Sequence, residues 1–140
     1  MPESHLVVEI SFEDSVKVSE VVDLYAANGW SSAEKPDELM AALRNSHSLV
    51  TARIQGKLVG IANAISDGHL VVYYPHLLVH PDNQGQGIGQ RIMAAMQDRY
   101  GSIHQQMLTA DVDSVGFYET IGFERAGNTV PMWIYAGDDH

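Results

Sequence analysis

Hydrophobic residues recur at helical spacing in four parts of the chain. The first pattern covers residues 15–30 and meets a stop signal at Asn28-Gly29. The second covers residues 35–45, with Pro36 in its first turn. The longest covers residues 87–101, and a short one at 113–123 ends at Gly122, which favours a left-handed cap. These patterns predict four helices.

Short runs rich in β-branched and aromatic residues lie between the helical patterns and predict strands. They cover residues 5–10, 48–54, 57–67, 70–80, 105–110 and 131–136. A Gln55-Gly56-Lys57 turn should join two of them as a hairpin. Pro75 cannot donate to a ladder, so it predicts a bulge or an opening in its strand. The order β-α-α-β-β-β-α-β-α-β-β is an α/β pattern with hairpins in the middle.

Composition narrows the class of protein. The length of 140 residues suits one domain, 1–140. There is no cysteine, the first residues do not resemble a signal peptide, and no apolar run reaches the roughly 18 residues of a membrane helix. We therefore expect a cytoplasmic location. The formal net charge of −10 argues against nucleic acid and anionic membranes as partners, and it would favour a cationic small molecule.

Three glycines stand at alternate positions where the longest helix begins. Gly85, Gly87 and Gly89 follow an apolar run that ends at His80-Pro81. Amides at a helix N-terminus have no partner within the helix and lie at the positive end of its dipole. A glycine-rich turn there lets an anion approach the backbone, and it needs no lysine. The loop is thus typical of an anion site, most simply one for a diphosphate.

Two common phosphate-binding motifs fit this loop poorly. A P-loop requires Lys-Ser/Thr after its last glycine, but Gln90-Arg91 follows here. A dinucleotide fingerprint that starts at Gly85 requires a third glycine where Gln90 stands. Asp111 lies about where a ribose-binding acid would fall, but the loop comes too late in the chain for that fold.

A third interpretation rests on two motifs in order. The loop resembles the coenzyme A loop, Gln/Arg-x-x-Gly-x-Gly/Ala, of the GCN5-related N-acetyltransferase (GNAT) superfamily. A second stretch resembles the family's later motif of an aromatic Tyr followed by Gly-Phe. The matching residues are Gln84, Gly87 and Gly89, the lead-in Val79 and Pro81, and then Phe117, Tyr118, Gly122 and Phe123. The finer pattern is most similar to the small-amine branch of the superfamily.

The resemblance implies a mixed, mostly antiparallel sheet flanked by helices, with two parallel strands that splay apart around acetyl-CoA. No metal is implied. By position, Leu77, Leu78 and Val79 would offer backbone groups to pantetheine. The amides from Gly85 to Gln90 would hold the pyrophosphate. The expected cofactor-binding residues are Leu77, Leu78, Val79, Gln84, Gly85, Gln86, Gly87, Ile88, Gly89, Gln90 and Asp111.

The resemblance also implies catalytic roles. Tyr118 would be the general acid that protonates the departing thiolate; otherwise it is a packing aromatic. A backbone amide of Leu77 or Leu78 could hold the oxyanion. His76 is a candidate base, but strand alternation turns it away from Tyr73 and the acetyl site unless a bulge re-aims it. A water chain to a carbonyl or a carboxylate is equally consistent.

Three further positions have open interpretations. The family often has Asn where Asp111 stands, so a helix N-cap is the expected role of Asp111. Trp30 could stack on a substrate or form part of the core, and Tyr73 could line the pocket. The expected function is acetyl transfer to a small primary amine. Protein N-termini or lysines as acceptors, and a non-catalytic CoA-binding domain, are alternatives. A homodimer could form through an edge strand at 131–136.

Overall fold

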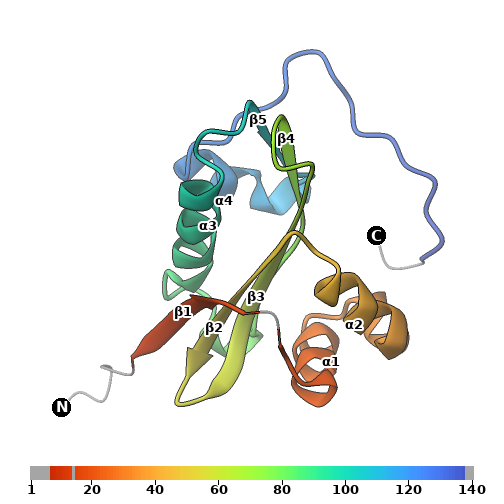
Figure 1. Ribbon diagram of the computed structural model, residues 1–140, viewed down its shortest axis with the longest axis vertical. Coiled ribbons are helices and arrows are strands. Elements are labelled where there is room, and N and C mark those ends of the chain that lie inside the picture. The colour runs from red at the N-terminus through yellow and green to blue at the C-terminus, as the bar shows by residue number, and fades with distance from the viewer. Residues whose placement is uncertain (1–6, 14, 138–140) are drawn as a thin grey trace.

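Five strands form one sheet in which each strand lies beside the one before it in the chain (Figure 1). The computed structural model describes residues 7–13 and 15–137. The strands are β1 (Val8–Phe12), β2 (Ser48–Ile54), β3 (Lys57–Ser66), β4 (Val71–Val79) and β5 (Gln105–Met107). All neighbours are antiparallel except β4 and β5, which are parallel. The predicted mixed, mostly antiparallel sheet is therefore confirmed.

Helices cover both faces of the sheet (Figure 1). The α-helices are α1 (Val18–Ala27), α2 (Pro36–Arg44), α3 (Ile88–Arg99) and α4 (Val115–Thr120). Short 3₁₀ turns cover Ser31–Glu34, Pro81–Asn83 and Val112–Ser114. The four predicted helices are all present within a few residues of the expected bounds. Among the described residues, no helix is long and apolar enough to cross a membrane.

Two apolar clusters hold the helices to the sheet. On one face, Ile92 and Met96 of α3 pack over strand residues such as Val50 and Ala62. On the other face, α1 and α2 pack over Ile61. Gly60 lets α3 come close, because a Cβ at this position would lie 2.9 Å from Ile92 Cδ1. The sheet is thus a central layer buried from both sides.

The turn residues have the conformations that their sequence predicted. Gln55 and Gly56 have φ of 51° and 80°, which is the pair of positive angles of a type I′ hairpin turn. Gly122 follows α4 with a φ of 102°, in the region that favours glycine. The sequence was sufficient to predict these turns, because the conformation of each depends only on its own few residues.

Pro75 lies in a bulge of β4, as its lack of an N–H predicted. The β3–β4 register runs from Asn63 opposite His76 to Ile65 opposite Tyr73, so that two residues of β4 face one of β3. The bulge inverts the alternation of side chains along β4. Val72 lies on the α3 face before it, whereas the odd-numbered Leu77 and Val79 lie on that face after it.

The predicted strand at 131–136 is wrong. Residues 128–137 form neither helix nor strand, and the segment curves away from the sheet (Figure 1). Its large apolar side chains are exposed. The sequence gives this segment strong β propensity, but a strand also needs a partner edge, and no described strand lies beside it. The edge of the sheet is instead the short strand β5.

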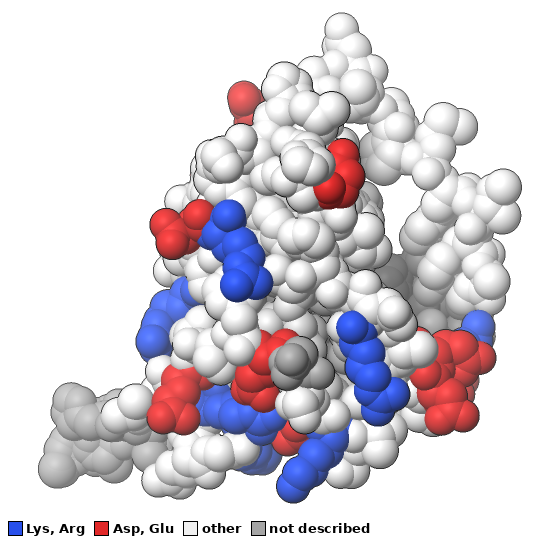
Figure 2. Space-filling model, viewed as in Figure 1, with Lys and Arg blue, Asp and Glu red and all other residues white. Residues whose placement is uncertain are grey.

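Charged side chains are scattered over the body of the protein on the face shown in Figure 2. Acidic and basic residues alternate there, and the large acidic excess is not gathered into one patch. The C-terminal segment that stands away from the body is uncharged in this view (Figure 2).

Candidate active site

The parallel strands β4 and β5 part soon after they meet. Their pairing runs from Val71 opposite Gln105 to Tyr73 opposite Met107 and then ends. β4 continues to Val79, and no other described strand pairs with it on that side. We refer to the side of β4 that Tyr74–Val79 leave open as the splay. It is the feature that the sequence resemblance implied.

Backbone groups of two residues face the splay. The His80 N–H donates to the Val59 carbonyl over 2.8 Å, which fixes one bonded pair of the β3–β4 ladder. Because bonded and non-bonded pairs alternate, the backbone of Leu78 is turned toward β3, while those of Leu77 and Val79 are turned away from it. The three residues expected to offer backbone groups are thus not equivalent.

The glycine loop leads directly into α3 with its amides unused. Gly85 and Gly87 have φ of 80° and 81°, and Gly87 is the N-cap of the helix. Arg91 is the first residue whose N–H makes a helical hydrogen bond; it donates to the Gly87 carbonyl over 3.1 Å. No described residue accepts a hydrogen bond from the amides of residues 85–90. A Cβ at Gly85 or Gly87 would meet nothing within 4 Å, so the loop is also sterically open.

These observations fit an anionic group such as a diphosphate. The free amides of Gln86, Ile88 and Gln90 belong to the same turn, and the positive end of the α3 dipole lies there. The side chain of Ile88 is buried in the core, so only its backbone is available. The Arg91 guanidinium instead donates to the Val8 carbonyl of β1 over 3.1 Å.

Gln84 braces the loop through its side chain. Its amide nitrogen donates to the Val79 carbonyl over 3.0 Å and approaches the Asn28 side-chain oxygen at 3.4 Å. The contact with Asn28 joins the loop to the end of α1. Gln84 therefore positions the loop relative to both β4 and α1.

Tyr118 is held close to the loop by its neighbour in α4. A Cβ at Gly89 would lie 3.3 Å from Phe117 Cζ, so the absence of a side chain lets α4 pack against the start of α3. The Tyr118 ring makes edge contacts with Phe117 and Phe123, with centroids 5.0 and 5.9 Å apart. Burial raises the pKa of the Tyr118 hydroxyl, and the nearby Asp111 carboxylate raises it further. The phenol therefore keeps its proton at neutral pH.

Asp111 occupies an N-cap position without making the cap bond that the sequence predicted. It precedes the 3₁₀ turn Val112–Ser114, and the Ser114 N–H donates to its backbone carbonyl over 2.8 Å. Its side chain caps neither this turn nor α4, whose N-cap is Ser114. The expected role of the Asp111 side chain as a cap is therefore wrong.

His76 is turned toward α1 by the bulge at Pro75. Its Nδ1 lies 2.8 Å from the Tyr25 hydroxyl, and its ring contacts Trp30 at 5.0 Å between centroids. Strict alternation would have put His76 on the face of Tyr74, under α3. The bulge therefore meets the condition on which the sequence made His76 a candidate, because Tyr73 and His76 share one face of β4.

The contact with Tyr25 bears on which nitrogen of His76 carries the proton. Tyr25 is fully buried, and burial holds the pKa of its hydroxyl far above the ordinary value, so it is a neutral O–H. A buried phenol donates its proton where it can, and Nδ1 lies within reach. With Tyr25 assigned as the donor on these grounds, His76 accepts at Nδ1 and its own proton is assigned to Nε2.

The two expected substrate residues lie in different surroundings. Trp30 is half-buried and packs edge-on against Tyr25 at 5.8 Å, so it belongs to the cluster around His76. Tyr73 is exposed, and its hydroxyl approaches the Thr109 hydroxyl at 3.4 Å, across the point where β4 and β5 part. Trp30 thus connects α1 to β4, and Tyr73 borders the splay.

Two residues of this region were missed in the sequence. Tyr25 seemed only a core position of α1, and Asn63 was not singled out. The Asn63 side chain is buried; its oxygen accepts from the His76 N–H over 3.1 Å, and its nitrogen donates to the Ser46 hydroxyl over 3.0 Å. A single Asn within the apolar run of β3 was an available signal, because a buried amide requires partners.

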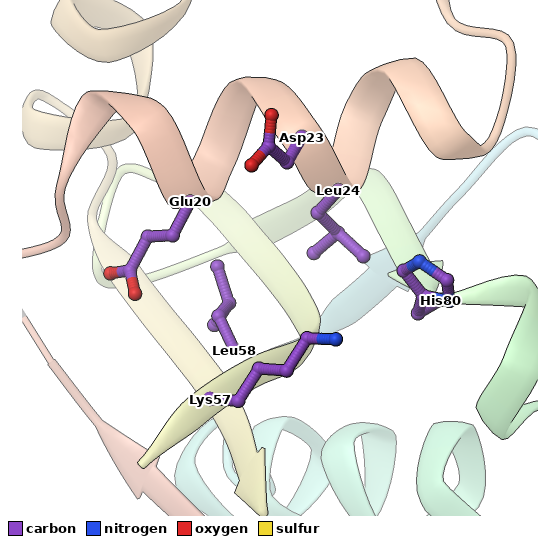
Figure 3. A pocket seen from close by; sticks show the side chains of 6 residues that line it. All are labelled: Glu20, Asp23, Leu24, Lys57, Leu58 and His80. Atoms are coloured by element: carbon purple, nitrogen blue, oxygen red, sulfur yellow. The ribbon is translucent and has the colours of Figure 1, made fainter.

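A separate pocket of about 310 Å³ lies between α1, the start of β3 and the residue after β4 (Figure 3). It is lined by Glu20, Asp23, Leu24, Lys57, Leu58 and His80. None of these is an expected site residue. His80 is instead an N-cap, since its Nδ1 accepts from the Asp82 N–H over 3.1 Å.

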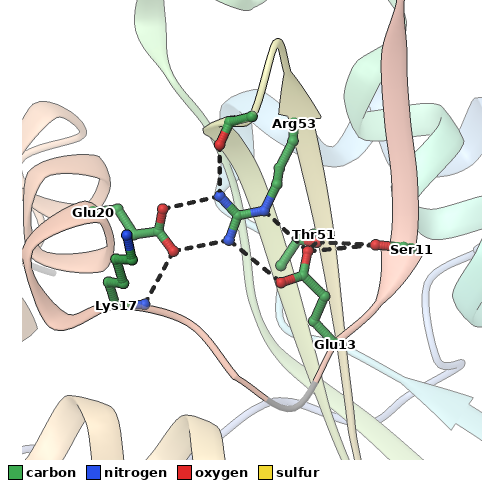
Figure 4. A network of polar contacts seen from close by, with 7 residues as sticks. Ser11, Glu13, Lys17, Glu20, Thr51 and Arg53 are labelled. Carbon is green, nitrogen blue, oxygen red and sulfur yellow. Dashed lines mark hydrogen bonds and ion pairs between the residues drawn. The ribbon is translucent and has the colours of Figure 1, made fainter.

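Glu20 of this pocket also belongs to an ion-pair network that ties three elements together (Figure 4). The Arg53 guanidinium of β2 contacts Glu20 of α1 at 2.8 Å and Glu13, after β1, at 3.0 Å. The Thr51 hydroxyl also donates to Glu13. The hydrogen bond from Arg53 lowers the pKa of Glu20 to about 2. The network braces α1 against the sheet.

A family model described as the acetyltransferase (GNAT) domain matches residues 17–132. The chain belongs to the GNAT acetyltransferase family. The match spans both motifs on which the resemblance was based, and the splayed sheet agrees with the fold that it implied.

Similar proteins extend this result. An uncharacterized N-acetyltransferase, ycf52, of Gracilaria tenuistipitata var. liui is 35% identical, with 83% of this chain and 66% of the relative covered. The N-alpha-acetyltransferase RimI of Mycobacterium tuberculosis is 32% identical over 64% of this chain and 60% of its own length. A solved GNAT-family acetyltransferase of Streptococcus pneumoniae superposes with a TM-score of 0.81 at 29% identity, covering 94% of this chain and all of the other.

Proposed function

We propose that the protein transfers the acetyl group of acetyl-CoA to the primary amine of a small molecule. The observation that carries this proposal is the coincidence of three features at one end of β4. They are a strand side left open, a row of unused amides, and a protonated phenol whose neighbour Phe117 packs against Gly89. None of the three alone would specify acyl transfer.

The first step is the binding of acetyl-CoA. The amides of residues 85–90 hold the pyrophosphate, which the left-handed Gly85 and Gly87 let approach the backbone. Pantetheine lies along β4 and pairs with the outward backbone groups of Leu77 and Val79. The Val79 carbonyl is shared with Gln84, so the Leu77 carbonyl is the principal acceptor for pantetheine.

The chemical step follows from the same arrangement. The amine nitrogen attacks the thioester carbon, and its electron pair forms the new C–N bond. The Leu77 N–H stabilises the oxyanion of the tetrahedral intermediate. The C–S bond then breaks, and Tyr118 donates its proton to the thiolate. A pKa raised by burial and by Asp111 suits this role, because the acid must be protonated at working pH.

His76 acts in this scheme as a donor through Nε2. A role as base would require the Tyr25 hydroxyl to turn its proton away from Nδ1. Tyr25 is buried, and it has no second acceptor among the described residues. The amine proton therefore leaves through water. His76 remains a candidate catalytic residue, with a role different from the one first expected.

The acceptor lies between Trp30 and Tyr73. Both are aromatic and lie on the same side of β4 as His76. Aromatic rings next to a site where an ammonium group enters favour a cationic ligand. The net charge of −10 adds a general attraction for such a molecule. The absence of cysteine supports a reducing compartment, and we propose a cytoplasmic location.

The first test is a thermal-shift titration with acetyl-CoA, CoA and NAD. We expect acetyl-CoA and CoA each to raise the melting temperature, and we expect NAD to leave it unchanged. A shift with NAD alone would overturn the proposal. A thiol-release assay with a panel of amines then measures turnover.

The amine panel separates the acceptor classes. It should include small polyamines, amino sugars and peptides with free N-termini. The similarity to RimI favours peptides as a second candidate class. Turnover of peptides alone would replace the small-molecule proposal, and CoA binding without turnover of any amine would indicate a non-catalytic domain.

A further inference from the structure

Asn63 places a buried amide in the otherwise apolar middle of β3. Only 3% of its surface is exposed, and its neighbours Ala62 and Ala64 are fully buried. A buried amide destabilises the fold unless it is hydrogen-bonded. Both ends of the Asn63 amide have a partner, because the oxygen accepts from the His76 N–H over 3.1 Å and the nitrogen donates to the Ser46 hydroxyl over 3.0 Å. The amide therefore connects β4 to the residues that follow α2.

The hydrogen bonds on either side of Asn63 run in one direction. The Ser46 hydroxyl donates its only proton to the Ala42 carbonyl, in the last turn of α2, over 2.8 Å. It must then accept from Asn63, and only the NH₂ group of the amide can donate to it. This assignment leaves the Asn63 oxygen to face the His76 N–H. The chain of hydrogen bonds thus begins at His76 and ends at α2.

The contact lies where the ladder between β3 and β4 is interrupted. Pro75 has no N–H, and the bulge separates the pair Asn63–His76 from the pair Ile65–Tyr73. His76 is thus the first residue after the bulge that is paired with β3. Residues directly opposite each other on two strands share a face, so the side chains of Asn63 and His76 lie together. The Asn63 oxygen fixes the backbone of His76 at the point where pairing resumes.

We propose that Asn63 is a positioning residue that holds the bulge of β4 at Pro75 and so determines where His76 points. The His76 ring then stays in edge contact with Tyr25 and Trp30, with centroids 5.4 and 5.0 Å away. A bulge displaced beyond His76 would turn this ring to the opposite face, under α3, because side chains alternate along a strand. The role of Asn63 in turnover rests on the proposed function, in which His76 donates through Nε2.

The first test is the position of the His76 ring, measured without acetyl-CoA or an amine. In the natural chain, nuclear Overhauser spectra should show contacts between the rings of His76 and Trp30. Asn63→Leu replaces the amide by an apolar side chain of similar shape, and these contacts should be lost. The contact between Tyr25 and Trp30, with centroids 5.8 Å apart, should remain and shows that α1 is still folded. Unchanged His76 contacts in Asn63→Leu would overturn the proposal.

Two further variants separate positioning from stability. Ser46→Ala removes only the support of the Asn63 amide at a partly exposed position, so it should fold and weaken the same His76 contacts. If Asn63→Leu does not fold, contacts of natural intensity in Ser46→Ala overturn the proposal. Thr51→Val is the matched control, because it removes a buried hydroxyl of the neighbouring strand that donates to Glu13. It should leave the His76 contacts unchanged, and their loss in this variant as well would overturn a specific role of Asn63.

Kinetics supply the functional test. Asn63→Leu should lower kcat/KM for the amine about tenfold, the value of a lost hydrogen bond, and leave the affinity for CoA unchanged. In the His76→Ala background the same substitution should have little further effect, since it acts through His76. An equal loss in both backgrounds would show that Asn63 acts through the fold alone and would overturn the positioning role. A natural chain that turns over no amine contradicts the proposed function alone, because the ring contacts still decide whether Asn63 positions His76.

Discussion

The Tyr25 hydroxyl lies 2.8 Å from His76 Nδ1, and with Tyr25 as the donor His76 carries its own proton at Nε2. The two residues are far apart in the sequence and come from α1 and β4. The bulge at Pro75 creates this contact, since it moves His76 to the α1 side of the sheet. In the proposed scheme this contact gives His76 the role of a donor at Nε2 in place of that of a general base.

A pair of substitutions at His76 separates the two roles. Gln can present an N–H near the position of Nε2, whereas Ala cannot. We expect His76→Ala to lower kcat/KM by about tenfold or more, the value of a lost hydrogen bond, and His76→Gln to restore most of the activity. Steady-state kinetics with saturating acetyl-CoA measure both. Equal losses in the two variants, together with a lost acid limb in the pH profile, would return His76 to the role of base.

Tyr118→Phe should lower kcat by roughly 10²–10⁴-fold, the usual contribution of a general acid. The affinity for CoA should not change, because the phenol meets the sulfur only as it departs. Isothermal titration with CoA supplies this control. A kcat of the variant equal to that of the natural enzyme would mean that Tyr118 is a packing residue only.

The pH profile carries a further prediction about Asp111. A general acid works while it is protonated, so activity is lost as pH rises through its pKa. Burial and the Asp111 charge raise the Tyr118 pKa above its usual 10, so no alkaline loss from Tyr118 should occur below that pH. Asp111→Asn removes the charge, and we expect its alkaline limb to move to lower pH than in the natural enzyme. An unmoved limb would show that the two groups are not coupled.

Local signals predicted most of the fold. Helix spacing, the Gln55-Gly56 turn and the bulge at Pro75 each depend on a few neighbouring residues, and each was confirmed. The strand at 131–136 failed because propensity does not specify a partner edge. The family resemblance implied the splay, which the parallel pairing confirms by its early end at Tyr73.

The site was less predictable where it depends on contacts between distant elements. No periodicity relates Tyr25 to His76, and the direction of His76 changes with a single extra residue in β4. Asp111 stands at the N-cap position that its residue type predicted, but its side chain makes no cap bond. The alternation of bonded pairs, which favours Leu77 over Leu78, is known only once the register of β3 and β4 is known.

Gly89→Ala should impair catalysis through Phe117. The new Cβ would lie 3.3 Å from Phe117 Cζ, closer than most contacts of this kind, so α4 or the ring must shift. Overpacking of this kind costs about 1–3 kcal/mol, and the shift would carry Tyr118 with it. We expect kcat to fall while the melting temperature drops by a few degrees. Gly116→Ala is the matched control, because a Cβ there meets nothing within 4 Å. Similar kinetics in the two variants would show that the packing at Gly89 does not affect the position of Tyr118.

The Arg53 network predicts that the free energy of unfolding depends on pH in the acid range. The pKa of Glu20 falls from 4.5 to about 2 in the folded chain, since Arg53 donates to its carboxylate. A depressed pKa stabilises the fold above the unfolded value of 4.5, and this contribution is lost as pH falls toward 2. Glu20→Gln should therefore lower the free energy of unfolding by roughly 2 kcal/mol at pH 7, the value of a hydrogen bond to a charged group. Urea unfolding at several pH values measures this difference, which should shrink below pH 4.5.

Glu124→Gln is the control, because it changes an exposed carboxylate that has no ion pair among the described residues. Its free energy of unfolding should match that of the natural chain at every pH. A difference for Glu20→Gln that stays constant down to pH 2 would mean that packing, and not the charge, is what the substitution removes.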